Sequence, residues 1–304
     1  MSTVGATFAP GRLPVPVPAP SWPGAVRAEI RKLAGQRSLW AMLAVAVLLV
    51  GLLALSLVTN DPSRRSYAHD PSGFMFLVSD VVQFAFTTGS GIVLLIVSAR
   101  TVGMEYSAGT IRVLYARGGG RLRLLAAKLA AVSVLGLLLL AGYLALWAAA
   151  LTAIAVIWAG TPHGLAAMPA RVWQDAGLCV VTCLISMAAS IVIGATAAVV
   201  GRSLAFGVGA ALAFFPADNM ADVILSLLHT FTGRQVWLDL SGFLLGPNLD
   251  ALSKALIRDH TVHSPMLQPF VTVDTRHALL VIGLWLAGML GLAVALVRRR
   301  DVLE

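Results

Sequence analysis

An acidic residue inside an apolar segment is the first candidate for chemistry in this chain. Asp80 lies with Gln83 in the apolar run 73–99. A charged group is costly in hydrocarbon, so Asp80 marks a possible intramembrane polar site, such as a proton site of a secondary carrier. Such carriers usually have several buried ionisable groups and repeat-related broken helices. Neither is evident here, and hydration near a membrane surface or a hydrogen bond to Gln83 is the simpler interpretation.

The histidines and cysteines form no complete catalytic or metal-binding set. His260 and His263 can share a helical face beside Asp259, but a specific metal site needs more ligands held in fixed geometry. The same loop could supply a Ser-His-Asp triad, yet no G-x-S-x-G nucleophile motif occurs in the sequence. Cys179 and Cys183 are four residues apart in an apolar run. This spacing places both on one face of a helix, where we expect them to be packing residues. We expect no metal and no catalytic residue.

The glycine-rich segments also lack the features of a nucleotide site. A phosphate-binding loop needs glycines followed by a lysine. Residues 118–120 are all glycine but lead into Arg121, and no lysine follows Gly109 and Thr110 closely. We therefore expect that the chain is not an enzyme and binds no cofactor. Any uphill transport must draw energy from a partner or an ion gradient.

The composition predicts an all-α, polytopic membrane protein. Hydrophobic residues make up 58% of the chain and charged residues 12%, whereas soluble domains have about 45–50% and about 25%. A bilayer-spanning helix needs about 20 apolar residues. Six runs approach this length, namely 39–58, 73–99, 129–156, 176–200, 204–228 and 278–297. The fifth is expected to be broken, because it contains Pro216, Asp218, Asn219 and Asp222.

The charge distribution predicts the orientation. With the N-terminus inside, fifteen Lys and Arg and four acidic residues fall on one side, against seven and nine on the other. Basic residues flanking spans stay on the cytoplasmic side. The sequence therefore predicts a multi-pass protein of the plasma membrane, in a bacterium, with both termini cytoplasmic. Basic residues at span ends meet anionic headgroups, so no nucleic-acid partner is expected.

Two segments precede the first span. Residues 1–20 are proline-rich and expected to be a disordered tail. Residues 21–38 have apolar positions at helical spacing and are expected to form an amphipathic elbow helix, with its apolar face in the lipid boundary and a role in transmitting motion. The elbow residues are Val26, Arg27, Ile30, Arg31 and Leu33.

The loop after the second span has the pattern of a docking element. Residues 107–116 can form a helix that the following glycines end. An apolar face on this helix could dock in a groove of a soluble partner. The candidate docking residues are Glu105, Gly109, Thr110, Ile111, Arg112, Leu114 and Tyr115. Arg121, Arg123 and Lys128 are expected to anchor the next span at the headgroups.

These loop residues, followed by an arginine at 121 and by Lys128, resemble the loop after the second span of ABC-2 type permeases, the membrane subunits of ATP-binding-cassette exporters. The order of parts over about 24–300 is also similar. The resemblance implies that 39–300 form one six-span transmembrane domain and that the loop is a coupling helix. It further implies a cytoplasmic ATPase subunit, which binds the ATP and Mg, and a second permease chain, identical or different. The long outer segment 230–276 departs from the family pattern.

The sequence thus favours the permease subunit of an ABC exporter. Two alternatives stay open at this point. One is an ion-coupled secondary carrier that uses Asp80, and the other is a membrane anchor that holds a partner protein without transport.

Overall fold

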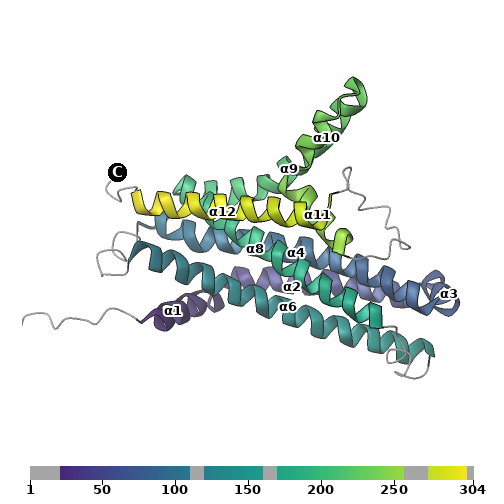
Figure 1. Ribbon diagram of the computed structural model, residues 1–304. Coiled ribbons are helices and arrows are strands. Elements are labelled where there is room, and N and C mark those ends of the chain that lie inside the picture. Colours follow the sequence, from purple (N-terminus) through teal and green to yellow (C-terminus); the bar gives the residue numbers. More distant parts are fainter. Residues whose placement is uncertain (1–20, 110–119, 160–169, 257–272, 300–304) are drawn as a thin grey trace, which may run out of the picture.

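The computed structural model describes residues 21–109, 120–159, 170–256 and 273–299, and within these ranges the regular elements are all α-helices. The helices are α1 (Trp22–Ala34), α2 (Arg37–Thr59), α3 (Asp61–His69), α4 (Pro71–Ser107), α6 (Arg121–Ala159), α8 (Ala170–Gly201), α9 (Leu204–Thr232), α10 (Val236–Ser241), α11 (Leu245–Leu256) and α12 (Thr275–Arg299). The long helices α2, α4, α6, α8 and α12 run side by side as one bundle (Figure 1). This architecture confirms the predicted fold class.

Five helices are long and apolar enough to cross a membrane among the described residues. The qualifying stretches are Ala85–Ser107, Arg121–Trp158, Ala176–Gly201, Leu204–Thr232 and Thr275–Arg299. A sixth is obtained if α1 and Arg37–Leu49 of α2, which meet at a bend of 66°, are taken as one broken span. The predicted first span, 39–58, lies within α2 and counts only in this sixth candidate, whereas the other five candidates overlap the five remaining predicted spans.

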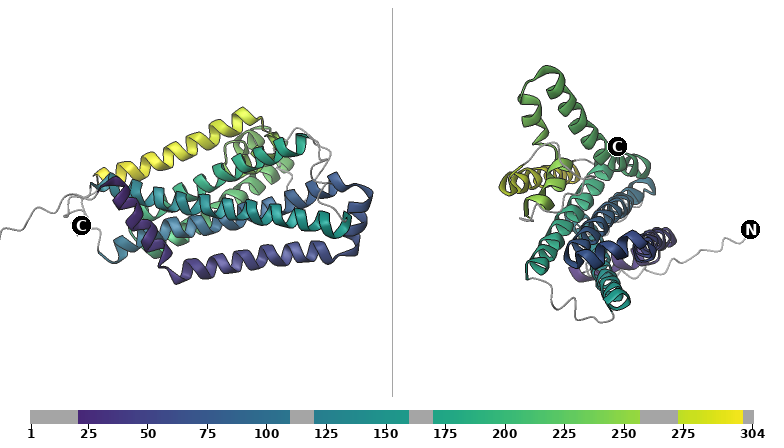
Figure 2. Two further views of the ribbon diagram at one scale, coloured as in Figure 1. Left: turned by 90° about the horizontal axis from the view of Figure 1, so that it is seen from below. Right: turned by 90° about the vertical axis from the view of Figure 1, so that its right-hand side faces the viewer.

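The bend between α1 and α2 has local causes. Ser21 precedes α1, and its side chain accepts a hydrogen bond from the backbone nitrogen of Gly24 at 3.3 Å. Pro23 lies in the first turn, where its missing N–H costs nothing. Gly35 ends the helix. The chain turns there, and α1 lies across the end of the bundle (Figure 2, left).

The apolar face of α1, which was expected in the lipid boundary, packs in part against the protein. Leu33 is only 4% exposed and belongs to a core cluster with Leu39, Phe86 and Val93, while Ile30 packs against the same cluster. Helix α1 also contacts the side of α6. Glu29 and Leu33 are the buried residues of α1, so one face of this helix packs on the bundle.

The central contact of the bundle is the crossing of α4 and α8. A Cβ atom on Gly194 would lie 2.4 Å from the carbonyl oxygen of Leu95, so only glycine permits this approach. Ser98 donates a hydrogen bond of 2.6 Å to the carbonyl oxygen of Ile191 across the same contact. Small residues that bring helices together, with hydroxyls bridging them, are typical of membrane bundles.

Helix α9 is continuous where a broken span was expected. Pro216 lies inside the helix, and Asp218 and Asp222 are each 8% exposed. The Asp218 carboxylate accepts a hydrogen bond from the backbone nitrogen of Gly246, and the Asp222 carboxylate accepts one from Ser241. The prediction of a break was wrong because the carboxylates find donors in the segment that follows α9.

The second half of α9 projects from the bundle together with α10, and the chain then returns through α11 (Figures 1 and 2). The return is fixed by buried polar contacts. Asn248, fully buried, donates to the carbonyl oxygens of Gly242 and Leu244 at 2.8 and 2.7 Å. His277 of α12 lies 2.8 Å from the same Gly242 oxygen.

Candidate functional site at the basic end

Many of the basic residues described by the structure gather at one end of the bundle, which we call the basic end. Here α4, α8 and α12 finish, α6 and α9 begin, and α1 lies across them (Figures 1 and 2). Its basic residues are Arg27, Arg31, Lys32, Arg37, Arg100, Arg121, Arg123, Lys128, Arg202, Arg298 and Arg299. The loop 110–119, most of the predicted docking element, joins α4 to α6 at this end but lies outside the described residues.

Four charged side chains from three helices form a closed charge ring at the basic end. Lys32 and Glu29 of α1 pair at 2.7 Å, and Glu29 pairs with Lys128 of α6 at 3.1 Å. Lys128 pairs with Glu105 of α4 at 2.7 Å, and Glu105 pairs with Lys32 at 3.3 Å. Signs alternate around the charge ring, so each ammonium contacts two carboxylates and its total charge is zero.

Most of the charge ring is buried. Glu29, Glu105 and Lys128 are 4%, 8% and 4% exposed. Taking such groups out of water costs several kcal/mol per ion, and only close opposite charges and hydrogen bonds offset this. Lys128 meets the requirement fully, because it also donates a 2.9 Å hydrogen bond to the carbonyl oxygen of Thr101 on α4.

Lys32 is the solvent-facing member, with a side chain 52% exposed. Burial by itself lowers the pKa of this ammonium, but the hydrogen bonds and negative charges of Glu29 and Glu105 together raise the pKa above its usual value. Lys32 therefore stays charged at neutral pH.

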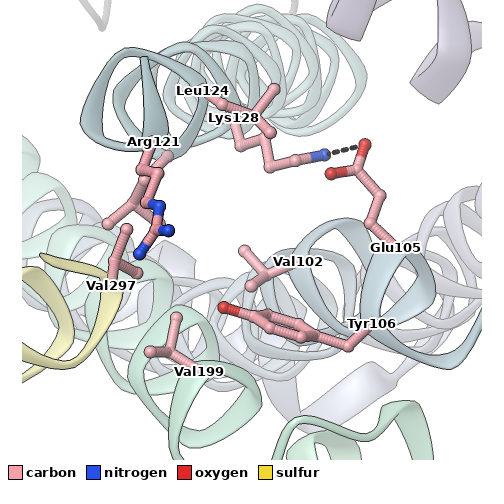
Figure 3. A pocket seen from close by; sticks show the side chains of 9 residues that line it. Val102, Glu105, Tyr106, Arg121, Leu124, Lys128, Val199 and Val297 are labelled. Carbon is pink, nitrogen blue, oxygen red and sulfur yellow. Dashed lines mark ion pairs between the residues drawn. The ribbon is translucent and has the colours of Figure 1, made fainter. Parts of the chain in front are cut away.

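A small cavity adjoins the charge ring between α4 and α6 (Figure 3). It measures about 20 Å³, enough for one water molecule. One carboxylate oxygen of Glu105, Oε2, is buried with no hydrogen-bond donor among the described residues. Arg121 lies on the opposite wall (Figure 3). The lining residues are Val102, Glu105, Tyr106, Arg121, Leu124, Leu125, Lys128, Val199 and Val297.

The structure brings some predicted site residues together and not others. Glu105 of the predicted docking element and Ile30 and Leu33 of the elbow helix meet at or beside the charge ring. Val26 is half-buried, and Arg27 and Arg31 are exposed on α1. Gly109 ends the described segment with a left-handed φ of 65°. Thr110, Ile111, Arg112, Leu114 and Tyr115 lie outside the described residues.

Three members of the charge ring were missed or misassigned from the sequence. Lys128 was expected at the headgroups, but it is buried because two carboxylates reach it. Glu29 and Lys32 were not singled out. A signal for Glu29 was present, since this acid lies between Val26 and Leu33 on the apolar face of α1, where a charge needs a partner.

The other candidate residues belong to α4, to α8 and to the segment 257–272. Asp80 and Gln83 lie within α4, but their side chains are outside the described residues, as are Asp259, His260 and His263. Neither Cys179 nor Cys183 of α8 is in a disulfide bond, and the Cys183 sulfur lies 3.5 Å from the hydroxyl of Thr87. In the part of the chain that the structure describes, no three His, Cys, Asp or Glu residues could hold a metal ion.

Comparison with known proteins identifies the class. Residues 25–217, from α1 to the middle of α9, match the family described as ABC-2 family transporter protein. The chain belongs to this family, and it is a membrane permease of an ABC transporter. Family membership implies a bilayer environment and an ATP-binding-cassette ATPase as partner. A search of curated proteins found no match.

Proposed function

We propose that this permease exports its substrate with energy from a separate ATPase subunit that docks on the loop after α4. The proposal places the basic end in the cytoplasm of a bacterial cell, as the excess of Lys and Arg there favours. ATP and Mg bind to the partner, and this chain supplies the pathway and the coupling elements but no ATPase site.

The observation that supports this proposal best is the position of the loop between two members of the charge ring. Glu105 lies near the end of α4 and Lys128 within the first two turns of α6, and both contact Glu29 or Lys32 of α1. A partner that moves the loop 110–119 therefore moves two helix ends that are connected to α1. The elbow residues would transmit that motion to α2.

The mechanism we propose is alternating access in a pair of permease chains. Nucleotide binding closes two ATPase subunits, the loops and α1 helices move, and the paired bundles open to the outside. Two copies of this chain, or this chain and a different one, would each line half of the pathway.

The docking test uses the apolar residues of the loop. An aspartate at Leu114 would bury an unpaired carboxylate in the ATPase groove, at a cost of several kcal/mol. We expect Leu114→Asp permease to reach the membrane, to lose co-purification with the cognate ATPase, and to fail to stimulate ATP hydrolysis. The milder pair Ile111→Ala and Leu114→Ala should weaken docking about 10- to 1000-fold, since each buried methylene contributes about 0.8 kcal/mol. Full co-purification and export by Leu114→Asp would refute docking at this loop.

The orientation is tested separately by labelling. A cysteine placed after Gly119 should be protected from an impermeant reagent added outside intact cells. Cysteines near Arg65, Gly164 or Leu256 should react. Reaction at Gly119 from outside would contradict both the orientation and the docking proposal.

A further inference from the structure

The charge ring can open between α1 and the other two helices without leaving a charge unpaired. We call this boundary the seam. Helix α1 contributes one residue of each sign, Glu29 and Lys32, while Glu105 and Lys128 belong to α4 and α6. If α1 moves away, each half of the charge ring is still a neutral ion pair.

The ion-pair distances differ between the seam and the two halves. The two contacts between α1 and the bundle are the longer ones, 3.1 Å for Glu29 to Lys128 and 3.3 Å for Lys32 to Glu105. The contacts within each half, Glu29 to Lys32 and Glu105 to Lys128, both measure 2.7 Å. The carbonyl oxygen of Thr101 also holds Lys128 on the bundle side. The ion-pair distances are thus shorter within each half than across the seam, although the buried Glu29–Lys128 pair also holds α1 on the bundle.

The usual penalty for breaking a buried ion pair does not arise at this seam. Removing one partner of such a pair is strongly destabilising because a buried charge is left uncompensated. Here Glu105 and Lys128 keep each other, and Lys32, already half-exposed, carries Glu29 toward solvent. The apolar side chains of α1, chiefly Ile30 and Leu33, can pass into the headgroup boundary, where amphipathic helices bind.

We propose that α1 is a releasable helix, which leaves α4 and α6 as a neutral unit and returns during each transport cycle. The proposal rests on the proposed function, because the ATPase would supply the motion. Glu29 is then a positioning residue that holds α1 in register only while the charge ring is closed.

The first test measures docking of α1 on the permease alone. Leu33→Cys is introduced with Cys179→Ala and Cys183→Ala, and its reaction rate with a water-soluble maleimide is measured in nanodiscs. Leu33 is 4% exposed, so docked α1 protects it. Two variants alter the seam at unchanged net charge. Glu29→Gln with Lys32→Gln removes the attraction, and Glu29→Lys with Lys32→Glu places like charges across the seam but keeps each half paired.

We expect the unchanged ring to react most slowly and the neutral variant to react faster. The exchanged variant should react fastest, at least about tenfold faster than the unchanged ring, because like charges then repel across the seam. Ala28→Gln, at an exposed position on α1 and with no change of charge, is the control and should react like the unchanged ring. An exchanged variant that reacts no faster than the neutral one would overturn the proposal, as would a rise with Ala28→Gln equal to that of the neutral variant.

The second test uses the complex with its ATPase. A non-hydrolysable ATP analogue should accelerate labelling of Leu33→Cys. An unchanged rate in a complex that exports substrate would overturn release of α1 and leave the proposed function standing. Failure of the permease to bind any ATPase would instead count against the proposed function, while the first test still decides whether the seam holds α1.

Discussion

Glu29 and Lys128 are 99 positions apart in the sequence, yet their charged atoms lie 3.1 Å apart with both side chains 5% exposed. This pair fixes the elbow helix α1 to the start of α6. It also explains why a basic residue two turns into an apolar span is tolerated: its charge is neutralised by α1 and α4 rather than by water.

The two lysines of the charge ring should differ in their effect on stability. Lys128→Met leaves two buried carboxylates to share the half-exposed Lys32, so we expect a loss of about 3–5 kcal/mol. Lys32→Met leaves Lys128 between both carboxylates and should cost at most about 1 kcal/mol, because this side chain is largely solvated. Thermal unfolding of the purified permease measures both. Equal shifts in Tm would show that Lys128 is not buried as the structure has it.

The closest helix contact can be tested with a pair of glycines. Gly194→Ala places a methyl group 2.4 Å from the Leu95 carbonyl oxygen and should force α4 and α8 apart, at a cost of about 1–3 kcal/mol. Gly283→Ala in α12 has no atom within 4 Å of the new methyl and should be neutral or stabilising by up to about 1 kcal/mol. Folded yield and Tm in detergent distinguish the two. A neutral Gly194→Ala would contradict the crossing.

The sequence predicted what depends on composition and on local spacing. Apolar length fixes which segments can span a bilayer, and the helices that contain 129–156, 176–200, 204–228 and 278–297 are all present. Ser21 and Pro23 are local signals for the start of α1, and the helix begins beside them. Such features need no knowledge of what lies across the fold.

The features that the sequence did not predict depend on contacts between distant segments. Whether Lys128 lies at headgroups or in the core depends on whether carboxylates from α1 and α4 reach it. Likewise, Asp218 and Asp222 suggest a broken helix until α10 and α11 are seen to supply their donors. The sequence of one chain does not show which distant residues contact each other. Its single indication of such a contact is a charged residue on an otherwise apolar helix face.

Asp218 should act as a remote cap of α11. Its carboxylate accepts the backbone N–H of Gly246 in the first turn of that helix, and losing a cap of this kind costs about 0.5–2 kcal/mol. We expect Asp218→Ala to speed amide hydrogen exchange across 245–252 and Asp218→Asn, which can still accept, to do so less. Asp239→Ala, an exposed acid on α10, is the control. Unchanged exchange in Asp218→Ala would show that α11 forms without this contact.

The remaining prediction separates an ATP-driven permease from an ion-coupled carrier. Asp80 lies within α4 and was the candidate proton site. If the ATPase supplies the energy, a neutral amide at this position removes no step of the cycle, so Asp80→Asn should keep most of the export activity. Export should also persist when a protonophore collapses the proton gradient while ATP is maintained. A carrier that uses Asp80 behaves in the opposite way, because its carboxylate must bind and release a proton in every cycle. Loss of export in Asp80→Asn protein that assembles normally, together with collapse of export by the protonophore, would therefore favour the carrier, whereas retained export under both conditions excludes it.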